Sequence, residues 1–304
     1  MAIQKEVWVQ DIQDILFQTN NQFLRQSVNH DPFVTNKTVH IPQSGSLAAA
    51  VKNRSVFPAS IQERTDTDLT YDLDDFTTDP VRIGNIDEIQ TSYLKRRSVM
   101  LHHNNILRDI IAIEGIFNWA SDTAANQVRT TGSTSTTNLP PSATGSRKKL
   151  TVADLAEVAK AFDNQNAPEE GRFLMLPSAM YYEVFTINDL IKSDIIGELT
   201  LPKAALKKVL GLNIMKRSDA QAVIYDNSGT PVKQAIGSAG SANDNFGAIG
   251  WHMDFVSTAM GAISVFEEVQ SPTLYGDVIS SQVLIKSRIL RTDEAGIVTL
   301  IQAA

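Results

Sequence analysis

Residues 151–186 constrain the fold more than any other stretch, because they predict a helix, a turn and a buried strand in close succession. Thr151 and Asp154 have the spacing of a capping box, in which each side chain accepts a hydrogen bond from the backbone amide of the other residue. An apolar face at helical spacing follows, made of Val152, Leu155, Ala159 and Phe162. The sequence therefore predicts an amphipathic helix that begins at Thr151.

The segment after this helix predicts a strand that is covered on both faces. Pro168 and the residue before it disfavour further helix, and Gly171 turns the chain. Phe173–Leu176 is a short apolar run before a proline, which is typical of a strand buried on both sides. Ser178 is placed to cap a second helix. These side chains pack rather than react, so the segment indicates a mechanical role.

The composition is that of an ordinary globular chain, and several classes of site are excluded. Of the 304 residues, 42% are hydrophobic and 20% are charged. The formal net charge of -7 gives no overall basic surface for nucleic acid. Cysteine is absent, which excludes disulfides, zinc–thiolate sites, iron–sulfur clusters and cysteine nucleophiles. No stretch approaches the roughly 18 apolar residues of a membrane span, so we expect no membrane partner.

The first 85 residues predict two elements that extend from a globular body. In residues 1–36, apolar side chains recur at roughly helical spacing, which fits either a helix on its own domain or an arm laid over a neighbouring chain. In residues 37–85, Thr38–Ile41 and Thr67–Leu73 alternate as strands do. The loop between them completes a long hairpin with few large apolar residues. Because such a hairpin is marginal in isolation, we expect it to lie on another surface.

The remaining elements are predicted by the same patterns. Residues 86–125 predict a helix, with an apolar face at Ile106, Ile110, Ile113 and Phe117. Residues 130–146 and 228–245 are rich in small polar residues and predict surface loops. Further strands are predicted at residues 213–215, 222–225, 247–251 and 281–291. Residues 293–296 predict a turn, after which residues 297–301 are expected to pair back on residues 281–291.

The search for reactive groups finds no catalytic motif. The five histidines do not form HExxH or another metal-binding spacing, and neither GxSxG nor GxxxxGK[ST] is present. The acidic stretch around residues 63–79 lacks the Gly and Glu positions of a calcium loop, whether the loop starts at Asp66 or at Asp72. We therefore predict no enzyme activity, no cofactor and no catalytic or metal site.

The acidic stretch has a second interpretation besides a solvated face. It can dock on basic surface of another copy of the chain, where complementary charge sets register more than affinity. Each exposed pair contributes only about 0–1 kcal/mol. The acidic candidates for contact between subunits are Asp66, Asp68, Asp72, Asp74 and Asp75. The basic candidates are Lys95, Arg96, Arg97, Arg147, Lys148 and Lys149.

The order of these elements resembles the major capsid protein of tailed phages, the Hong Kong 97-type fold. The residues that carry the resemblance are the run from Gly171 and Arg172 to Pro177, and the ending from Tyr275-Gly-Asp-Val through Arg288 to Gly296-Ile-Val. The resemblance implies an α+β fold with an N-terminal arm and an extended E-loop. It also implies a P-domain with a spine helix and long antiparallel strands, and an A-domain. The implied boundaries are 1–36 for the arm, 37–85 for the E-loop, 86–170 with 270–304 for the P-domain, and 171–269 for the A-domain. The helix at residues 151–165 resembles the spine helix.

The family implies a function as well. Its members assemble as hexamers and pentamers into an icosahedral head around double-stranded DNA, which they contact weakly and non-specifically. The implied partners are further copies of the chain and portal, scaffold or decoration proteins. The implied location is the virion, after assembly in the host cytoplasm. Three alternatives stay open: an encapsulin-like shell of a cellular nanocompartment, an enzyme on an α+β scaffold, and a tail or neck protein that forms rings or tubes.

Overall fold

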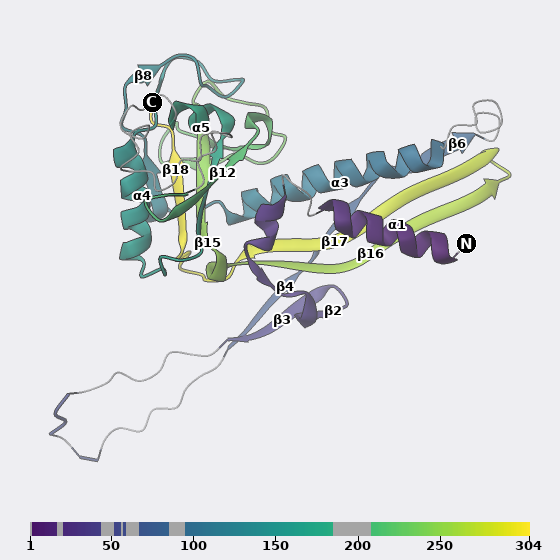
Figure 1. The fold of residues 1–304 in the computed structure, drawn as a ribbon, viewed down its shortest axis with the longest axis horizontal. Helices are drawn as coiled ribbons and strands as arrows, with labels where there is room; N and C mark the ends of the chain where they lie inside the picture. Colours follow the sequence, from purple (N-terminus) through teal and green to yellow (C-terminus); the bar gives the residue numbers. More distant parts are fainter. Residues whose placement is uncertain are drawn as a thin grey trace.

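The computed structural model describes residues 2–16, 21–43, 52–55, 57–58, 67–84, 95–184 and 208–304. The described part is elongated (Figure 1). A body with a large sheet and short helices occupies one end, and a long two-stranded ribbon with a long helix beside it extends from that body.

The body is built on an eight-stranded sheet in the order β11-β12-β10-β15-β13-β14, with β18 paired to β15 and to β7. Strands β10 and β12 are parallel, whereas β10 and β15 are antiparallel. Every residue of β10 and of β15 is buried, so the strand predicted to be covered on both faces is confirmed. The strand bounds are β7 Gln127–Arg129, β10 Arg172–Pro177, β11 Lys208–Val209, β12 Leu212–Arg217, β13 Val223–Asp226, β14 Val232–Lys233, β15 Asp244–His252 and β18 Ile297–Ile301.

Two helices pack on this sheet. Helix α4 (Val152–Asn164) begins with the predicted capping box: Thr151 Oγ1 accepts from the amide of Asp154 at 3.3 Å, and Asp154 Oδ2 accepts from the amide of Thr151 at 2.8 Å. The buried apolar face of α4 lies against β18 and β7. Helix α5 (Ser178–Val184) follows β10 directly.

The start of α5 uses a residue that is distant in sequence. Ser178 Oγ donates to the carbonyl of Arg217 at 2.9 Å. The backbone amide of Ala179, in the first turn of the helix, donates to Asp219 Oδ1, also at 2.9 Å. The carboxylate of Asp219 therefore satisfies one of the unpaired amides at this helix end. The prediction named only the local serine for this end, because a partner some forty residues away leaves no local pattern.

The ribbon belongs to a second, five-stranded sheet. Strands β16 (Val256–Ser271) and β17 (Gly276–Ile289) pair antiparallel along their length, and β1 (Val28–Asn29) adds in parallel to β16. Strands β5 (Asp74–Thr77) and β6 (Val81–Gly84) both pair with β17. Helix α3 (Lys95–Trp119) lies along β17, and helix α1 (Ala2–Leu16) packs on α3 and β16 (Figure 1).

Two smaller sheets and five short 3₁₀ turns complete the described part of the fold. One small sheet has the order β2-β3-β4, and the other pairs β8 with β9. Their bounds are β2 Val34–Thr35, β3 Thr38–Gln43, β4 Thr67–Asp72, β8 Thr134–Ser135 and β9 Arg147–Lys148. The 3₁₀ turns are η1 Gln22–Arg25, η2 Asp31–Phe33, η3 Ala124–Asn126, η4 Asp219–Gln221 and η5 Met253–Phe255.

A cluster of aromatic side chains joins the two main sheets. Trp119 at the end of α3 lies with its ring centroid 5.3 Å from that of Trp251 on β15. Phe173 stacks on Trp251 at 5.5 Å, and Phe23 meets Trp119 edge-on at 5.7 Å. Trp119 and Trp251 are fully buried, so this cluster forms the centre of the largest hydrophobic core.

The predicted pairing of residues 297–301 with residues 281–291 is wrong. The turn forms, with Gly296 at φ 79°, but β18 then pairs antiparallel with β15 and parallel with β7. All five residues of β18 are buried, whereas β17 alternates between buried and half-buried positions. An apolar strand of this kind is stable in the middle of a sheet covered on both faces, which the ribbon does not offer.

The helix at residues 151–165 is not the one that lies along the long strands. That helix is α3, whose 25 residues extend about 37 Å, while α4 has 13 residues and covers the other sheet. Helix α3 also ends at Trp119, before the predicted end at residue 125. The carbonyl of Ser121 instead accepts from the buried hydroxyl of Tyr225 at 2.8 Å.

Residues 2–16 pack on their own chain. Ile12 is 0% exposed and Leu16 is 1% exposed in the core between α1, α3 and β16. Of the two interpretations left open for this segment, a helix on its own domain is the one that the structure has. The predicted hairpin strands also form, since β3 pairs with β4 from Thr38 opposite Asp72 to Gln43 opposite Thr67.

Candidate assembly surfaces

The acidic residues predicted for subunit contacts lie on two consecutive strands. Asp68 and Asp72 are on β4, and Asp74 and Asp75 are on β5. Asp66 lies outside the described residues. Asp68, Asp72 and Asp75 are exposed, while Asp74 is half-buried. Four of the five predicted acids therefore lie on two strands that follow each other in the chain but belong to different sheets.

Each of these four acids already has a partner in its own chain. Lys286 Nζ on β17 lies 2.7 Å from Asp74 Oδ2. Asp75 accepts from Gln282 Nε2 at 2.8 Å, and Asp72 accepts from Thr38 Oγ1 at 2.7 Å. Asp68 Oδ2 lies 3.3 Å from His40 Nδ1. The contacts of Asp74 and Asp75 join β5 to the ribbon, whereas those of Asp68 and Asp72 join β4 to β3. The exposed carboxylates of β4 still have lone pairs that face water.

The basic residues are placed less uniformly. Lys95 and Arg96 begin α3, and their side chains lie outside the described residues. Arg97 is exposed and borders a groove that Asp11 and Asp14 of α1 also line. Lys148 and Lys149 are half-buried. In the described ranges, no ion pair links this basic set to the acidic strands.

Arg147 is a buried structural residue and presents no charge at the surface. Its side chain is 6% exposed, and its terminal nitrogens donate to four backbone carbonyls at 2.9–3.1 Å. These carbonyls belong to Thr144, Ser146, Ala242 and Asp244. Nε also donates to Asn245 Oδ1. The basic triplet thus offers only Lys148 and Lys149 for contact, and Arg147 instead joins the two predicted surface loops, 130–146 and 228–245.

The histidines are individually engaged. His30 Nδ1 lies 3.0 Å from the hydroxyl of Tyr71, and His252 Nε2 lies 2.7 Å from the carbonyl of Glu170. Burial lowers the pKa of His30 and of His103 below the ordinary value of 6.5. Among the described residues, no group of three or more His, Cys, Asp or Glu side chains is placed to hold a metal ion. No described helix is both long enough and apolar enough to cross a bilayer.

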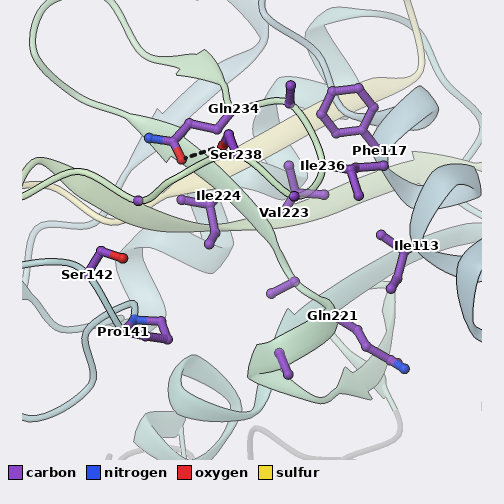
Figure 2. Close-up of a pocket in the computed structure, with 15 residues that line it drawn as sticks. Ile113, Phe117, Pro141, Ser142, Gln221, Val223, Ile224, Gln234, Ile236 and Ser238 are labelled. Atoms are coloured by element: carbon purple, nitrogen blue, oxygen red, sulfur yellow. Dashed lines mark hydrogen bonds between the residues drawn. The ribbon is translucent and has the colours of Figure 1, made fainter.

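A hollow of about 220 Å³ lies where α3 meets the body, and Figure 2 shows the residues that line it. Ile113 and Phe117 of α3 form one wall, and Pro141 and Ile236 come from the two surface loops. Its polar groups are amides and hydroxyls, such as Gln234, which accepts from Ser238 Oγ at 3.3 Å. Among the residues that the structure describes, no Asp, Glu, His, Lys or Arg lines the hollow, so none of them acts there as a general acid or base.

An apolar stripe on α3 leads into this hollow. Ile106, Ile110, Ile113 and Phe117 recur at helical spacing, as the sequence predicts, but Ile110 is 45% exposed. The opposite face of α3 carries the buried residues Leu107, Ile111, Ile116 and Trp119. A second exposed apolar group, Phe266, Leu274 and Tyr275, lies at the far end of the ribbon, and sequence reasoning missed it. Aromatic and branched residues at a hairpin end follow no pattern that separates an exposed position from a buried one.

Chains of solved phage capsids share this architecture. A chain from the capsid of the cyanophage P-SCSP1u matches with a TM-score of 0.64 at 16% identity, over 90% of this chain and 86% of that chain. A chain from the capsid of Ralstonia phage GP4 has a TM-score of 0.62 at 10% identity, over 92% of this chain and 87% of that chain. A chain from the mature capsid of bacteriophage PhiM1 has a TM-score of 0.59 at 9% identity, over 90% and 84%. No protein-family model and no curated protein matches the sequence.

The predicted fold class is therefore confirmed. The chain has an α+β fold of the tailed-phage major capsid type, the Hong Kong 97-type fold that its sequence resembles. At identities of 16% and below, the likeness establishes the architecture of the chain.

Proposed function

We propose that this protein is the major capsid protein of a tailed phage, and that it self-assembles as hexamers and pentamers into an icosahedral head around double-stranded DNA. The observation that carries the proposal is the fold shared with phage capsid chains over about 90% of this chain. The shape of the molecule supports this proposal, because an elongated chain with exposed acidic and apolar surfaces can make many small contacts with neighbouring subunits. Closed symmetry multiplies such contacts into a stable shell.

The viral head is favoured over the alternatives by the origin of the similar structures. The solved chains reported above belong to phages, which supports a virion protein over an encapsulin-like nanocompartment shell. A non-enzymatic role is part of this proposal. So are assembly in the host cytoplasm, residence in the virion, and portal, scaffold or decoration proteins as partners. The net charge of -7 supports a wall that contacts packaged DNA only weakly.

The predicted regions become proposals about assembly. Residues 1–36 would correspond to the N-terminal arm, although helix α1 packs on its own chain, and residues 37–85 would correspond to the E-loop. The P-domain (86–170 with 270–304) and the A-domain (171–269) are proposed with two adjustments. Strand β16 pairs with β17 along its length and β18 pairs with β15, so we assign 256–271 to the P-domain and 297–301 to the A-domain.

Electron microscopy of purified recombinant protein tests the proposal. Closed polyhedra with local six-fold and five-fold capsomers are expected in negative stain. Nuclease-resistant DNA in heads recovered from infected cells would separate a virion from a nanocompartment. Discrete monomers under every assembly condition, or tubes and rings alone, would contradict the proposed shell.

The contact residues are tested by charge reversal. The acidic candidates are Asp66, Asp68, Asp72, Asp74 and Asp75, and the basic candidates are Lys95, Arg96, Arg97, Lys148 and Lys149. The double variant Asp72→Lys with Asp75→Lys changes two exposed carboxylates, whereas Asp74 is left intact because it pairs with Lys286. We expect slower assembly at low salt and a smaller difference at high salt, since salt screens exposed charges.

The matched control is Glu157→Lys, which reverses an exposed acid on α4 that pairs with Lys160. It should assemble like the wild type. Unchanged assembly of the double variant at low salt would remove the acidic strands from the interface and leave the shell proposal standing.

A further inference from the structure

The apolar stripe on α3, formed by Ile106, Ile110, Ile113 and Phe117, has the spacing of a coiled-coil contact. Its members are separated by four, three and four residues, which is the alternation of a and d positions in a heptad repeat. Ile106 is 39% exposed and Ile110 is 45% exposed, so the described part of the chain leaves this stretch uncovered. The spacing favours a second α-helix as the covering element, because side chains at a and d fit between those of a helix at a small crossing angle.

The hollow at the C-terminal end of the stripe is large enough to receive a side chain of such a helix. Ile113 and Phe117 form one of its walls, and Ile236 of the body also lines it (Figure 2). Its volume of about 220 Å³ exceeds the roughly 150 Å³ of an apolar cavity that holds a benzene ring. Lys233 Nζ donates to the carbonyls of Phe117 at 3.3 Å and of Ala120 at 2.9 Å. These bonds fix the end of α3 on the body, so the stripe and the hollow form one continuous surface.

The charged residues beside the stripe define which helix fits. With Ile110 at an a position, Asp109 takes the g position before it and Glu114 takes the e position after it. Charges at e and g set the choice of partner in paired helices. Asp109 Oδ1 lies 3.1 Å from Arg108 Nε, and the Asp109 side chain is still 46% exposed. Burial, and then the charge of Asp74, raise the pKa of Glu114, so a further cation beside it would stabilise its charged form.

A second copy of α3 does not fit this surface, because the same two acids would meet each other. In a parallel pair of helices, g positions face e positions. In an antiparallel pair, g faces g and e faces e. Either direction places Asp109 and Glu114 opposite carboxylates, and such like-charge contacts disfavour pairing. The occupant is therefore a helix of a different protein, with basic residues at its own e and g positions.

We propose that the stripe and the hollow bind one amphipathic α-helix of another protein, which carries large apolar residues at a and d and lysine or arginine at e and g. Its apolar residues pack on Ile106 and Ile110, and one of them enters the hollow. Its basic residues lie beside Asp109 and Glu114. This contact needs only one folded subunit, so it can be measured apart from shell formation.

Fluorescence anisotropy with the unassembled full-length chain tests the site. The probe is a labelled designed peptide of three heptads with Leu at a and d, Lys at e and g, and Ala or Gln elsewhere. We expect saturable binding to the wild type, and at least about tenfold weaker binding to Ile110→Ser. Ile106→Ser gives the same test if Ile110→Ser does not fold. Phe266→Ser changes a similarly exposed apolar residue at the far end of the ribbon, so this control should bind as the wild type does.

Exchange of charges gives a second measurement. A peptide with Glu in place of Lys at e and g should bind the wild type at least about tenfold more weakly, and should bind Asp109→Lys better than the wild type. A peptide of the same composition with scrambled a and d positions should not show saturable binding. Absence of binding of the lysine peptide, equal affinity for the scrambled peptide, or unchanged binding to the serine variants overturns the proposal. So does self-association of free wild-type subunits that Ile110→Ser abolishes, because a second copy would then cover the stripe.

Discussion

Arg147 and Asp74 show at the scale of single residues how a charged side chain can look free in sequence and be engaged in the fold. Arg147 lies within a basic triplet, yet its guanidinium donates to the carbonyls of the two surface loops. Asp74 lies within an acidic run, yet it pairs with Lys286 from more than two hundred positions away. Charge runs predict a charged surface, but only tertiary contacts decide which members of the run remain available.

Replacing Arg147 should therefore destabilise the folded chain itself. In Arg147→Met, four backbone carbonyls lose their donor, and that of Asp244 is buried, so we expect the free energy of unfolding to fall by about 2–4 kcal/mol. Urea unfolding of the unassembled protein measures this. Lys149→Met, two positions along and half-buried, serves as the control and should change stability by less than about 0.5 kcal/mol. Equal effects of the two substitutions would mean that the loops do not depend on Arg147.

The buried histidines predict a pH dependence of stability. Burial is the main reason why the pKa of His30 is lowered, and the nearby Asp31 opposes the shift. The folded state therefore binds fewer protons than the unfolded state once the pH falls below about 6.5, and stability is lost as the pH falls further. His103 acts in the same direction, through burial and then through its neighbour His102.

Comparison of His30→Gln with the wild type isolates this effect. The glutamine does not titrate and can still reach the hydroxyl of Tyr71, so the loss of stability between pH 7 and pH 5 should be smaller in the variant. Urea midpoints across this range measure it. His40→Gln, at an exposed position, is the control and should follow the wild-type curve. Parallel curves for all three proteins would count against the assignment to His30.

At the scale of elements, local signals predicted elements well and their pairing poorly. The capping box at Thr151 and the apolar run at Phe173–Leu176 each depend on a few consecutive residues, and both are confirmed. Strand β18 was predicted as a strand but with the wrong partner, because its partner is set by burial on two faces. Helix α3 was predicted, but its packing along β17 was not. That packing depends on the tertiary fold, which local patterns do not define.

Helix α1 gives a prediction that separates two roles for the N-terminal segment. Leu16 is fully buried against its own chain, so Leu16→Ala should lower the free energy of unfolding of the unassembled protein by about 2–5 kcal/mol. Urea unfolding measures the loss before any shell forms. If the helix lay across a neighbouring subunit instead, free subunits of the variant and the wild type would unfold together, and only assembled shells would differ.

A matched control for this prediction is available on the same helix. Gln13→Ala changes an exposed position on α1 and leaves the buried face intact, so it should change stability little. A loss in Leu16→Ala without a loss in Gln13→Ala assigns the effect to burial rather than to helix propensity.

At the scale of the whole molecule, the candidate site is a set of surfaces rather than a pocket. The exposed acids of β4 could be predicted from the sequence, because charged residues that alternate with apolar ones in a strand lie on its solvent-facing side. The exposed stripe on α3 was predicted only as an apolar face. Which of its two apolar faces meets β17 depends on the rotation of the helix in the fold, which periodicity alone does not define.

The excursion between β3 and β4 gives a prediction for the assembled state, and it rests on the proposed shell. Lys52 and Arg54 are exposed, and Phe57 is 76% exposed. Trypsin should cleave after Lys52 and Arg54 rapidly in free subunits, and at least about tenfold more slowly in shells, where neighbouring subunits would cover them. Mass spectrometry of timed digests measures both rates. The heat-unfolded chain controls for intrinsic cleavage, and equal rates in shells and subunits would show that assembly leaves this segment uncovered.

The position of β18 has a consequence for synthesis. This strand follows every other described strand in sequence, yet it lies between β15 and β7 with all of its residues buried. The eight-stranded sheet therefore cannot be completed while residues 297–301 are still inside the ribosome. Until they emerge, the edge of β15 that pairs with β18 has no partner strand. A translation product that stops before Ile297 lacks this strand and cannot complete the sheet. Prematurely terminated chains should therefore misfold before they can enter an assembly.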